Sequence, residues 1–386
     1  IIHIVLARLP DAPEGTEGIS LFIVPKYLPE QIGVPNGVSC GSLENKMGIH
    51  GNATCVMNFD GATGYLIGPA NKGLKCMFTF MNTARIGTAL QGLAHAEWGF
   101  QHSLSYAKDR LQMRSLTGVK AADQVADPII VHPEVRKMLL TQKAFAEGGR
   151  ALIYYCAQLV DKEKQVADAE ESAKAEQLLA FLTPIAKAFL TEVGFESANH
   201  ALQIYGGHGY IAEWGMEQNV RDCRISMLYE GTTQIQALDL LGRKVLLSRG
   251  KSLRGFTQII DAYCQDEARN SELSVFITEL KRLNEEWLLL TREIGMKALK
   301  NRDEVGAASV DYLMYSGYVT LAYFWARMAS IALHKQSDDE SGFYRAKWST
   351  AHFYFQRILP RTRGLVETMR SGSANLMELE VEHFSV

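Results

Sequence analysis

The segment ISMLYEGTTQIQALDLLGRK places Glu230 between an apolar run and Gly231. Two natural N-cap residues, Thr232 and Thr233, follow directly. A helix that begins here offers free N–H groups and the positive end of its dipole, which suit an anionic ligand. A carboxylate held in an apolar pocket becomes a competent base near neutral pH. Glu230 is therefore a candidate general base, although a capping or surface carboxylate explains these residues equally well.

A second segment, LQIYGGHGYIAEW, carries the closely spaced glycines Gly206, Gly207 and Gly209. It is not a dinucleotide-binding fingerprint, because a helical pattern precedes it where that motif requires a strand. One interpretation is a helix C-cap followed by a tight turn. The other is exposed backbone that a flat or phosphorylated ligand can approach, since glycine has no Cβ. The residues alone leave both interpretations open.

The elements that must position these segments change in type near residue 70. Before it, short β-branched runs alternate with Gly, Pro and Asn, which predicts strands. Two of these runs, IIHIVL and ISLFIV, are apolar on both faces, so we expect both faces to be buried. After it, the pattern predicts long helices joined by short loops, which is typical of a four-helix bundle. The expected helices are residues 71–110, 133–160, 178–205 and 232–247.

A second helical set follows the stretch SRGKSL. Apolar residues between Phe276 and Ile294 recur at spacings of three and four, which predicts one buried helix face. Aromatic-rich helices are expected at residues 309–335 and 343–359, with their rings in core or interface packing. The expected fold class is mainly α with a β part. The expected domains are residues 1–70, 71–249 and 250–386.

Composition limits the partners and the compartment. The net charge of −3 disfavours nucleic acid and anionic membranes, which select basic surfaces. No apolar run reaches the roughly 18–20 residues that span a bilayer. The six cysteines are far apart and form no C-x-x-C pair, which argues against a metal site and for a reducing, cytoplasmic location. The first residues, IIHIVLAR, read as a strand in mid-sheet, so we expect an N-terminal part to be absent.

The segment YEGTTQIQ resembles the catalytic segment of the acyl-CoA dehydrogenase flavoenzymes, whose usual form is Y-E-G-T-[ST]-x-I-Q. Further resemblances occur in the family's order over residues 1–247: KMGIHG, FDG, FMNTARIGTALQGLAHA, YAKDRLQMR and LQIYGGHGY. The helical extension resembles the longer subgroup typified by 3-methylmercaptopropionyl-CoA dehydrogenase. The implied fold is a remnant of the middle β-domain, then the C-terminal four-helix bundle, then an additional helical domain.

The resemblance implies a reaction of fatty acid metabolism, the α,β-dehydrogenation step of β-oxidation. Glu230 would remove the α-proton of an acyl-CoA thioester while the β-hydride passes to FAD, leaving a trans-2-enoyl-CoA. The backbone N–H of Glu230 would stabilise the thioester carbonyl. Tyr229 and Arg85 would lie at the substrate, although a helix-surface salt bridge also explains Arg85. Electrons would go to an electron-transfer flavoprotein. The alternatives are an acyl-CoA oxidase that uses oxygen and an inactive helical scaffold.

The resemblance also implies FAD contacts from two places. Gly231, Thr232 and Gln234 match positions that bind FAD beside the base. A second set would reach the FAD of a neighbouring subunit, which implies a homodimer or homotetramer: Arg110, Gln203, Gly206 and Gly207.

The chain departs from the family pattern after Arg110. The usual K-x-F-G is replaced by LQMR, so no flavin contact is assigned to Met113. An insertion from Ser115 to Val131 lengthens the loop that follows, and His208 is taken as structural.

Overall fold

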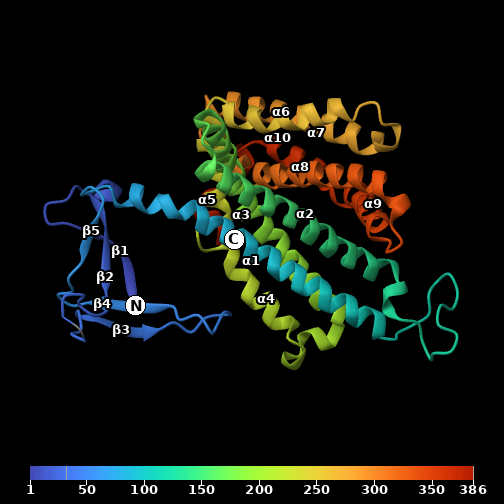
Figure 1. Ribbon diagram of the computed structural model, residues 1–386, viewed down its shortest axis with the longest axis horizontal. Coiled ribbons are helices and arrows are strands. Elements are labelled where there is room, and N and C mark those ends of the chain that lie inside the picture. Colours follow the sequence, from blue (N-terminus) through green and yellow to red (C-terminus); the bar gives the residue numbers. More distant parts are fainter. Residues whose placement is uncertain (32, 386) are drawn as a thin grey trace. The chain divides into compact units, whose positions relative to one another are not determined.

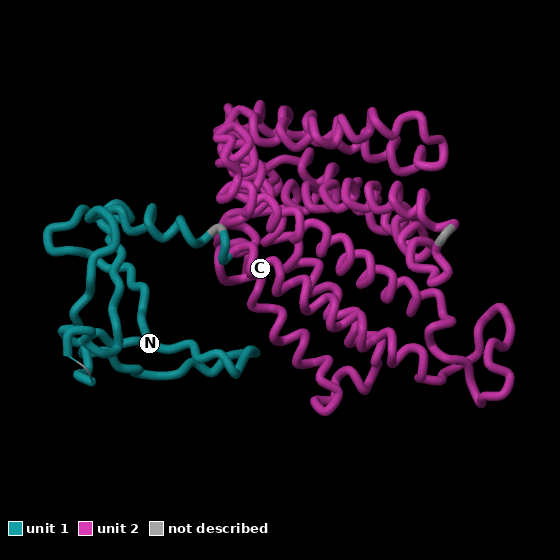
Figure 2. The backbone as a smooth tube through the Cα atoms, viewed as in Figure 1, with its two compact units in different colours: residues 1–84 teal, residues 85–386 magenta. Residues whose placement is uncertain are grey.

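Near residue 70, where the hydrophobic period of the sequence changes, the computed structural model changes from strands to helices (Figure 1). The structure describes residues 1–31 and 33–385. The chain divides into two compact units, residues 1–84 and 85–386 (Figure 2). The molecule is mainly helical with a small β part, as the sequence predicts.

The first unit holds two small antiparallel sheets. In one sheet the central strand β2 (Ile19–Pro25) pairs with β1 (Ile2–Arg8) on one side and β5 (Tyr65–Ile67) on the other. The other sheet pairs β3 (Val38–Leu43) with β4 (Cys55–Phe59). The pattern did not predict β3, because Gly, Ser and Cys dominate it.

The prediction that β1 is buried on both faces is wrong. Ile2, Ile4 and Leu6 are 68%, 50% and 40% exposed. These residues alternate along β1, so their side chains share one face of the sheet, and that face is exposed.

Three long helices form the frame of the second unit: α1 (Gly73–Asp109), α2 (Pro133–Gln165) and α3 (Ala169–Tyr205). Pro133 occupies the first turn of α2, and the Asp168 side chain caps α3 by accepting the Glu170 N–H at 2.8 Å. α2 and α3 pack along their lengths (Figure 1). α1 and α3 approach closely at two glycines, where a Cβ on Gly92 would lie 2.5 Å from the Leu190 oxygen. These glycines allow the backbones of α1 and α3, the helices beside the candidate site, to pack in direct contact.

Among the residues that the structure describes, one segment, 169–210, is long and apolar enough to cross a membrane by length and composition, and it contains α3. Within its most apolar window, 78% is buried inside the protein. Such burial is typical of a core helix. Phe181, Ile185 and Phe189 are fully buried, so core packing accounts for the high hydropathy of this helix.

The C-terminal helices share one continuous apolar core with the bundle. The Phe181 ring of α3 lies 6.0 Å from that of Trp287, and the Trp325 indole donates to the Ala144 oxygen at 3.1 Å. Tyr354 donates to the Tyr318 oxygen, which ties two further helices together. The helices of this region are α6 (Lys251–Asp266), α7 (Ser274–Ala298), α8 (Asp303–Lys335), α9 (Phe343–Phe353), α10 (Arg361–Ser371) and α11 (Ala374–Met377).

Candidate active site

The turn that carries Glu230 joins α4 (Met216–Arg224) to α5 (Thr233–Leu238), which continues into the π-helical segment η6 (Asp239–Leu246). Glu230 and Gly231 both have positive φ angles, 57° and 90°. Only glycine adopts this conformation without cost, so Glu230 is held in a strained one. Thr232 caps α5, because its hydroxyl oxygen accepts the Ile235 N–H at 3.3 Å. The predicted helix start is confirmed.

The Glu230 side chain is half-buried, and its Oε2 is buried with no hydrogen-bond partner. An unpartnered buried carboxylate oxygen is costly, and its presence calls for a structural or functional reason. The oxygen is therefore free to accept a proton from a bound molecule.

Three hydrogen bonds hold this turn, two of them to backbone carbonyls and one between side chains. Gln236 donates to the Glu230 carbonyl at 3.0 Å, and Thr233 donates to the Glu192 carboxylate at 2.6 Å. Lys187, fully buried on α3, donates to the Gly231 carbonyl at 2.6 Å. Burial lowers the pKa of Lys187 to about 8, against the opposing effect of the Glu230 carboxylate. No role for Lys187 was predicted from the sequence, although a lysine inside the apolar run LLAFLTPIAKAFL indicates a buried charged residue.

The remaining residues predicted beside Glu230 lie on neighbouring elements. Arg85 of α1 is buried and pairs with Asp239 of η6 at 3.5 Å. Tyr229 donates to the side-chain oxygen of Gln91 on α1 and is 37% exposed. Gln234 is exposed and contacts the hydroxyl of Ser309 at 3.4 Å.

The glycine turn lies at the end of α3. Gly206 has a φ of 58° and ends the helix, and Gly207 follows it. A Cβ built on either would meet nothing within 4 Å, so both present open backbone, and Gln203 beside them is exposed. Gly209 differs, because its Cβ would lie 2.3 Å from the Leu202 oxygen. The turn is thus a C-cap and also an accessible surface.

Arg110 lines a cavity of about 470 Å³ with an aromatic wall that the sequence analysis missed. Tyr106 and Tyr205 stack at 4.0 Å, and His208 and Trp214 stack at 4.6 Å. The His208 Nδ1 also lies 2.9 Å from the Tyr106 hydroxyl. These aromatic residues are spread over α1, α3 and the turns after it, so their convergence depends on tertiary structure.

The two clusters lie far apart within one chain. Arg85 and Arg110 are 25 positions apart along α1 and its end. At 1.5 Å per residue, this is roughly 37 Å. The residues around Glu230 and those around Arg110 therefore do not form one site in a single chain.

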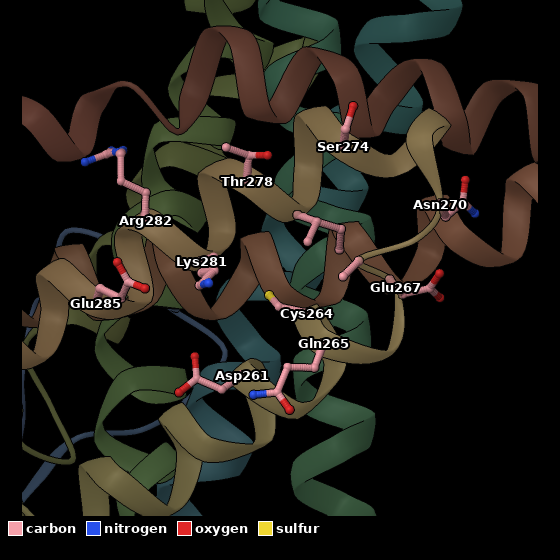
Figure 3. Close-up of a pocket in the computed structure, with 12 residues that line it drawn as sticks. Asp261, Cys264, Gln265, Glu267, Asn270, Ser274, Thr278, Lys281, Arg282 and Glu285 are labelled. Carbon is pink, nitrogen blue, oxygen red and sulfur yellow. The ribbon is translucent and has the colours of Figure 1, made fainter.

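Another cavity, of about 600 Å³, lies between α6 and α7 and contains none of the predicted residues. Figure 3 shows Asp261 and Gln265 of α6 and Lys281 and Glu285 of α7 around it. Within residues 1–31 and 33–385, no group of three or more His, Cys, Asp or Glu is placed to hold a metal ion.

Comparison with known proteins gives two matching family models. The model "Acyl-CoA dehydrogenase, C-terminal domain" matches residues 71–246. The model "Acetyl-CoA dehydrogenase C-terminal like" matches residues 256–380. Between them they cover most of the helical part of the chain.

Curated relatives match nearly the whole chain but extend beyond it. The 3-methylmercaptopropionyl-CoA dehydrogenase of Ruegeria pomeroyi is 42% identical over 93% of this chain and 61% of its own length. The broad-specificity linear acyl-CoA dehydrogenase FadE5 of Mycobacterium tuberculosis is 33% identical over 100% of this chain and 66% of its own length. The chain thus spans less than two thirds of these relatives.

Solved structures share the fold at lower identity. Caenorhabditis elegans ACDH-11 in complex with C11-CoA has a TM-score of 0.77 and 18% identity, covering 98% of this chain and 61% of that one. An acyl-CoA dehydrogenase from Bacillus anthracis complexed with FAD has a TM-score of 0.72 and 21% identity, covering 96% and 61%. With both family models and the YEGTTQIQ turn around Glu230, these matches lead to one conclusion: the chain belongs to the acyl-CoA dehydrogenase family.

Proposed function

We propose that the protein is an FAD-dependent acyl-CoA dehydrogenase in which Glu230 is the catalytic base. The observation that carries this proposal is the buried Glu230 Oε2 without a hydrogen-bond partner, on a strained turn that three hydrogen bonds hold. A base that must accept a proton from carbon cannot be occupied by a protein donor. The oxidoreductase names of the relatives agree with this role.

Each of these residues has a separate role in the proposed reaction. Glu230 takes the α-proton, and its backbone N–H donates to the thioester carbonyl as negative charge develops there. Tyr229 and Arg85 flank the substrate from the turn and from α1. When bound, FAD supplies the acceptor for the β-hydride. The loss of both hydrogens leaves a trans-2-enoyl-CoA.

The residues present fit FAD at two places. Beside the base, Gly231 and Thr232 offer backbone at a helix start, and Gln234 is exposed next to them. The second place is about 37 Å from Arg85 along α1: Arg110 is exposed there, and Gln203, Gly206 and Gly207 at the end of α3 are also exposed. We therefore assign the second set to the FAD of a neighbouring subunit in a homodimer or homotetramer. We also propose a cytoplasmic location and an electron-transfer flavoprotein as acceptor.

The test is anaerobic turnover of the purified full-length protein with a panel of acyl-CoA thioesters. The proposal predicts that mass spectrometry finds products that have lost two hydrogens, in more than one equivalent per bound FAD only when an electron-transfer flavoprotein is present as acceptor. Stoichiometric peroxide under air would instead identify an acyl-CoA oxidase. A colourless protein that binds no added FAD would support the inactive scaffold and contradict the proposal.

A further inference from the structure

Lys187 is a buried cation that the proposed chemistry leaves without a role. Its relative exposure is 0%, and the neighbouring Ile185, Ala186 and Phe189 are equally buried. Burying an ammonium group costs several kcal/mol unless it is paired and hydrogen-bonded. Its bond to the Gly231 carbonyl, at 2.6 Å, places this cation directly against the turn of the base.

Three charged groups face Lys187 from the elements around it. Glu230 comes from the turn, Arg85 from α1 and Glu192 from one turn further along α3. Burial lowers the pKa of Lys187 most, Glu230 opposes this, Arg85 lowers the pKa further, and Glu192 opposes it. With a pKa of about 8, Lys187 is mainly an ammonium at neutral pH. It therefore places a positive charge beside the Glu230 carboxylate.

The geometry of the peptide unit gives the hydrogen bond a direction. In a trans peptide, the carbonyl of one residue and the N–H of the next point in opposite directions. Because Lys187 holds the Gly231 carbonyl inward, the Thr232 N–H points away from α3. Gln236 acts in the same way on the Glu230 carbonyl and the Gly231 N–H. These two hydrogen bonds hold Glu230 and Gly231 in a left-handed backbone conformation, which is unfavourable for the non-glycine residue Glu230.

We propose that Lys187 is a positioning residue for Glu230: its ammonium fixes the Gly231 peptide and so holds the neighbouring Glu230 side chain in place to accept the substrate proton. This inference rests on the proposed function of Glu230. It assigns Lys187 no contact with substrate or cofactor.

The experiment uses two substitutions in the full-length protein. Lys187→Met removes both the donor and the charge, whereas Lys187→Gln removes the charge but keeps a donor. Thr183→Val is the matched control, because it deletes a buried hydroxyl on α3 that bonds only the Leu179 carbonyl at 2.7 Å. We expect Lys187→Met to lower kcat/KM about 10- to 100-fold with little change in KM. Lys187→Gln should keep most of the wild-type kcat/KM, because its amide can still donate to the Gly231 carbonyl.

Amide hydrogen exchange provides a readout that needs no turnover. Exchange in residues 229–235 rises roughly tenfold in Lys187→Met and stays near wild type in Lys187→Gln and Thr183→Val. If Lys187→Met does not fold, Lys187→Gln decides the matter: exchange and kcat/KM near wild type support the inference, and raised exchange of the turn contradicts it.

The inference is overturned if kcat/KM and the exchange of the turn in Lys187→Met match wild type. It is also overturned if the control changes them equally, or if neither Lys187 variant folds while Thr183→Val does. A wild-type protein that holds FAD but oxidises no acyl-CoA would instead remove the proposed function. In that case the exchange data would still decide whether Lys187 fixes the turn.

Discussion

At the residue scale, the turn depends on glycine at position 231. Its φ of 90° disfavours any side chain, and a Cβ there would lie 2.5 Å from the Gln236 Nε2, which holds the Glu230 carbonyl. We predict that Gly231→Ala lowers the free energy of unfolding by about 2 kcal/mol and weakens FAD binding. Chemical denaturation and flavin titration measure the two effects.

The control for this substitution is Gly255→Ala. Gly255 lies on the exposed face of α6, and a Cβ there would meet nothing within 4 Å. Alanine in a helix interior should raise the stability by about 0.5–1 kcal/mol. A Gly231→Ala protein as stable as this control would contradict the strain assigned to the turn.

The sequence alone singled out the proposed base, Glu230, but not the residues that contact its turn from other elements. Glu230, Gly231 and Thr232 are consecutive, so their relation is local and can be read from residue types. Lys187 is 43 positions before Glu230, and Trp214 faces Tyr106 from more than 100 positions away. Contacts of this kind arise from helix packing, which no local pattern encodes.

At the element scale, an ion pair ties α10 to the bundle. Arg361 makes a bidentate contact with Glu196 of α3 at 2.7 and 2.9 Å, and His200 lies 3.4 Å from the same carboxylate. Burial alone would raise the pKa of Glu196, but hydrogen bonds from His200 and Arg361 outweigh it and lower the pKa to about 2. Because folding lowers this pKa, Glu196 stabilises the folded protein at pH values above the unfolded pKa of about 4.5. This stabilisation is lost as the pH falls toward 2.

We therefore predict that Glu196→Gln lowers the free energy of unfolding at pH 7 by about 1–2 kcal/mol, after allowance for solvent screening. The difference from wild type should shrink as the pH falls from about 4.5 toward 2, because wild-type Glu196 is then protonated. Urea denaturation across this range measures it. Glu279→Gln, which loses a pair within α7 only, should change stability by about 0.5 kcal/mol or less. A pH-independent difference for Glu196→Gln would contradict the assignment.

The helices were the most predictable elements, for physical reasons. Proline-free periodic stretches predicted α1, and Pro133 correctly marked the start of α2. The charge-rich stretch after residue 160 hid the start of α3 at Ala169, because a solvated helix end and a linker have similar composition. The short helix α4 was missed, since nine mostly polar residues give a weak periodic signal.

At the whole-molecule scale, the proposed FAD contacts of the two clusters would have to come from two different subunits. If Glu230 of one subunit and Arg110 of its neighbour serve the same FAD, a defect in each of two chains can be combined so that both fall in the same site. A heterodimer of Glu230→Gln and Arg110→Ala chains then has one site with both defects and one intact site. We predict about half of wild-type activity from such a doubly tagged heterodimer, with each parent homodimer nearly inactive. Activity no higher than the mean of the parents would place each site within a single chain.

The central claim is that Glu230 removes the substrate proton. The most direct measurement is anaerobic acyl-CoA titration of the full-length wild type and Glu230→Gln, each loaded with FAD, followed by the visible flavin absorbance. Glutamine keeps the size of the side chain but cannot accept the proton. The account predicts that wild-type flavin bleaches on addition of substrate, while Glu230→Gln retains FAD and does not bleach. Equal bleaching in both proteins would contradict it.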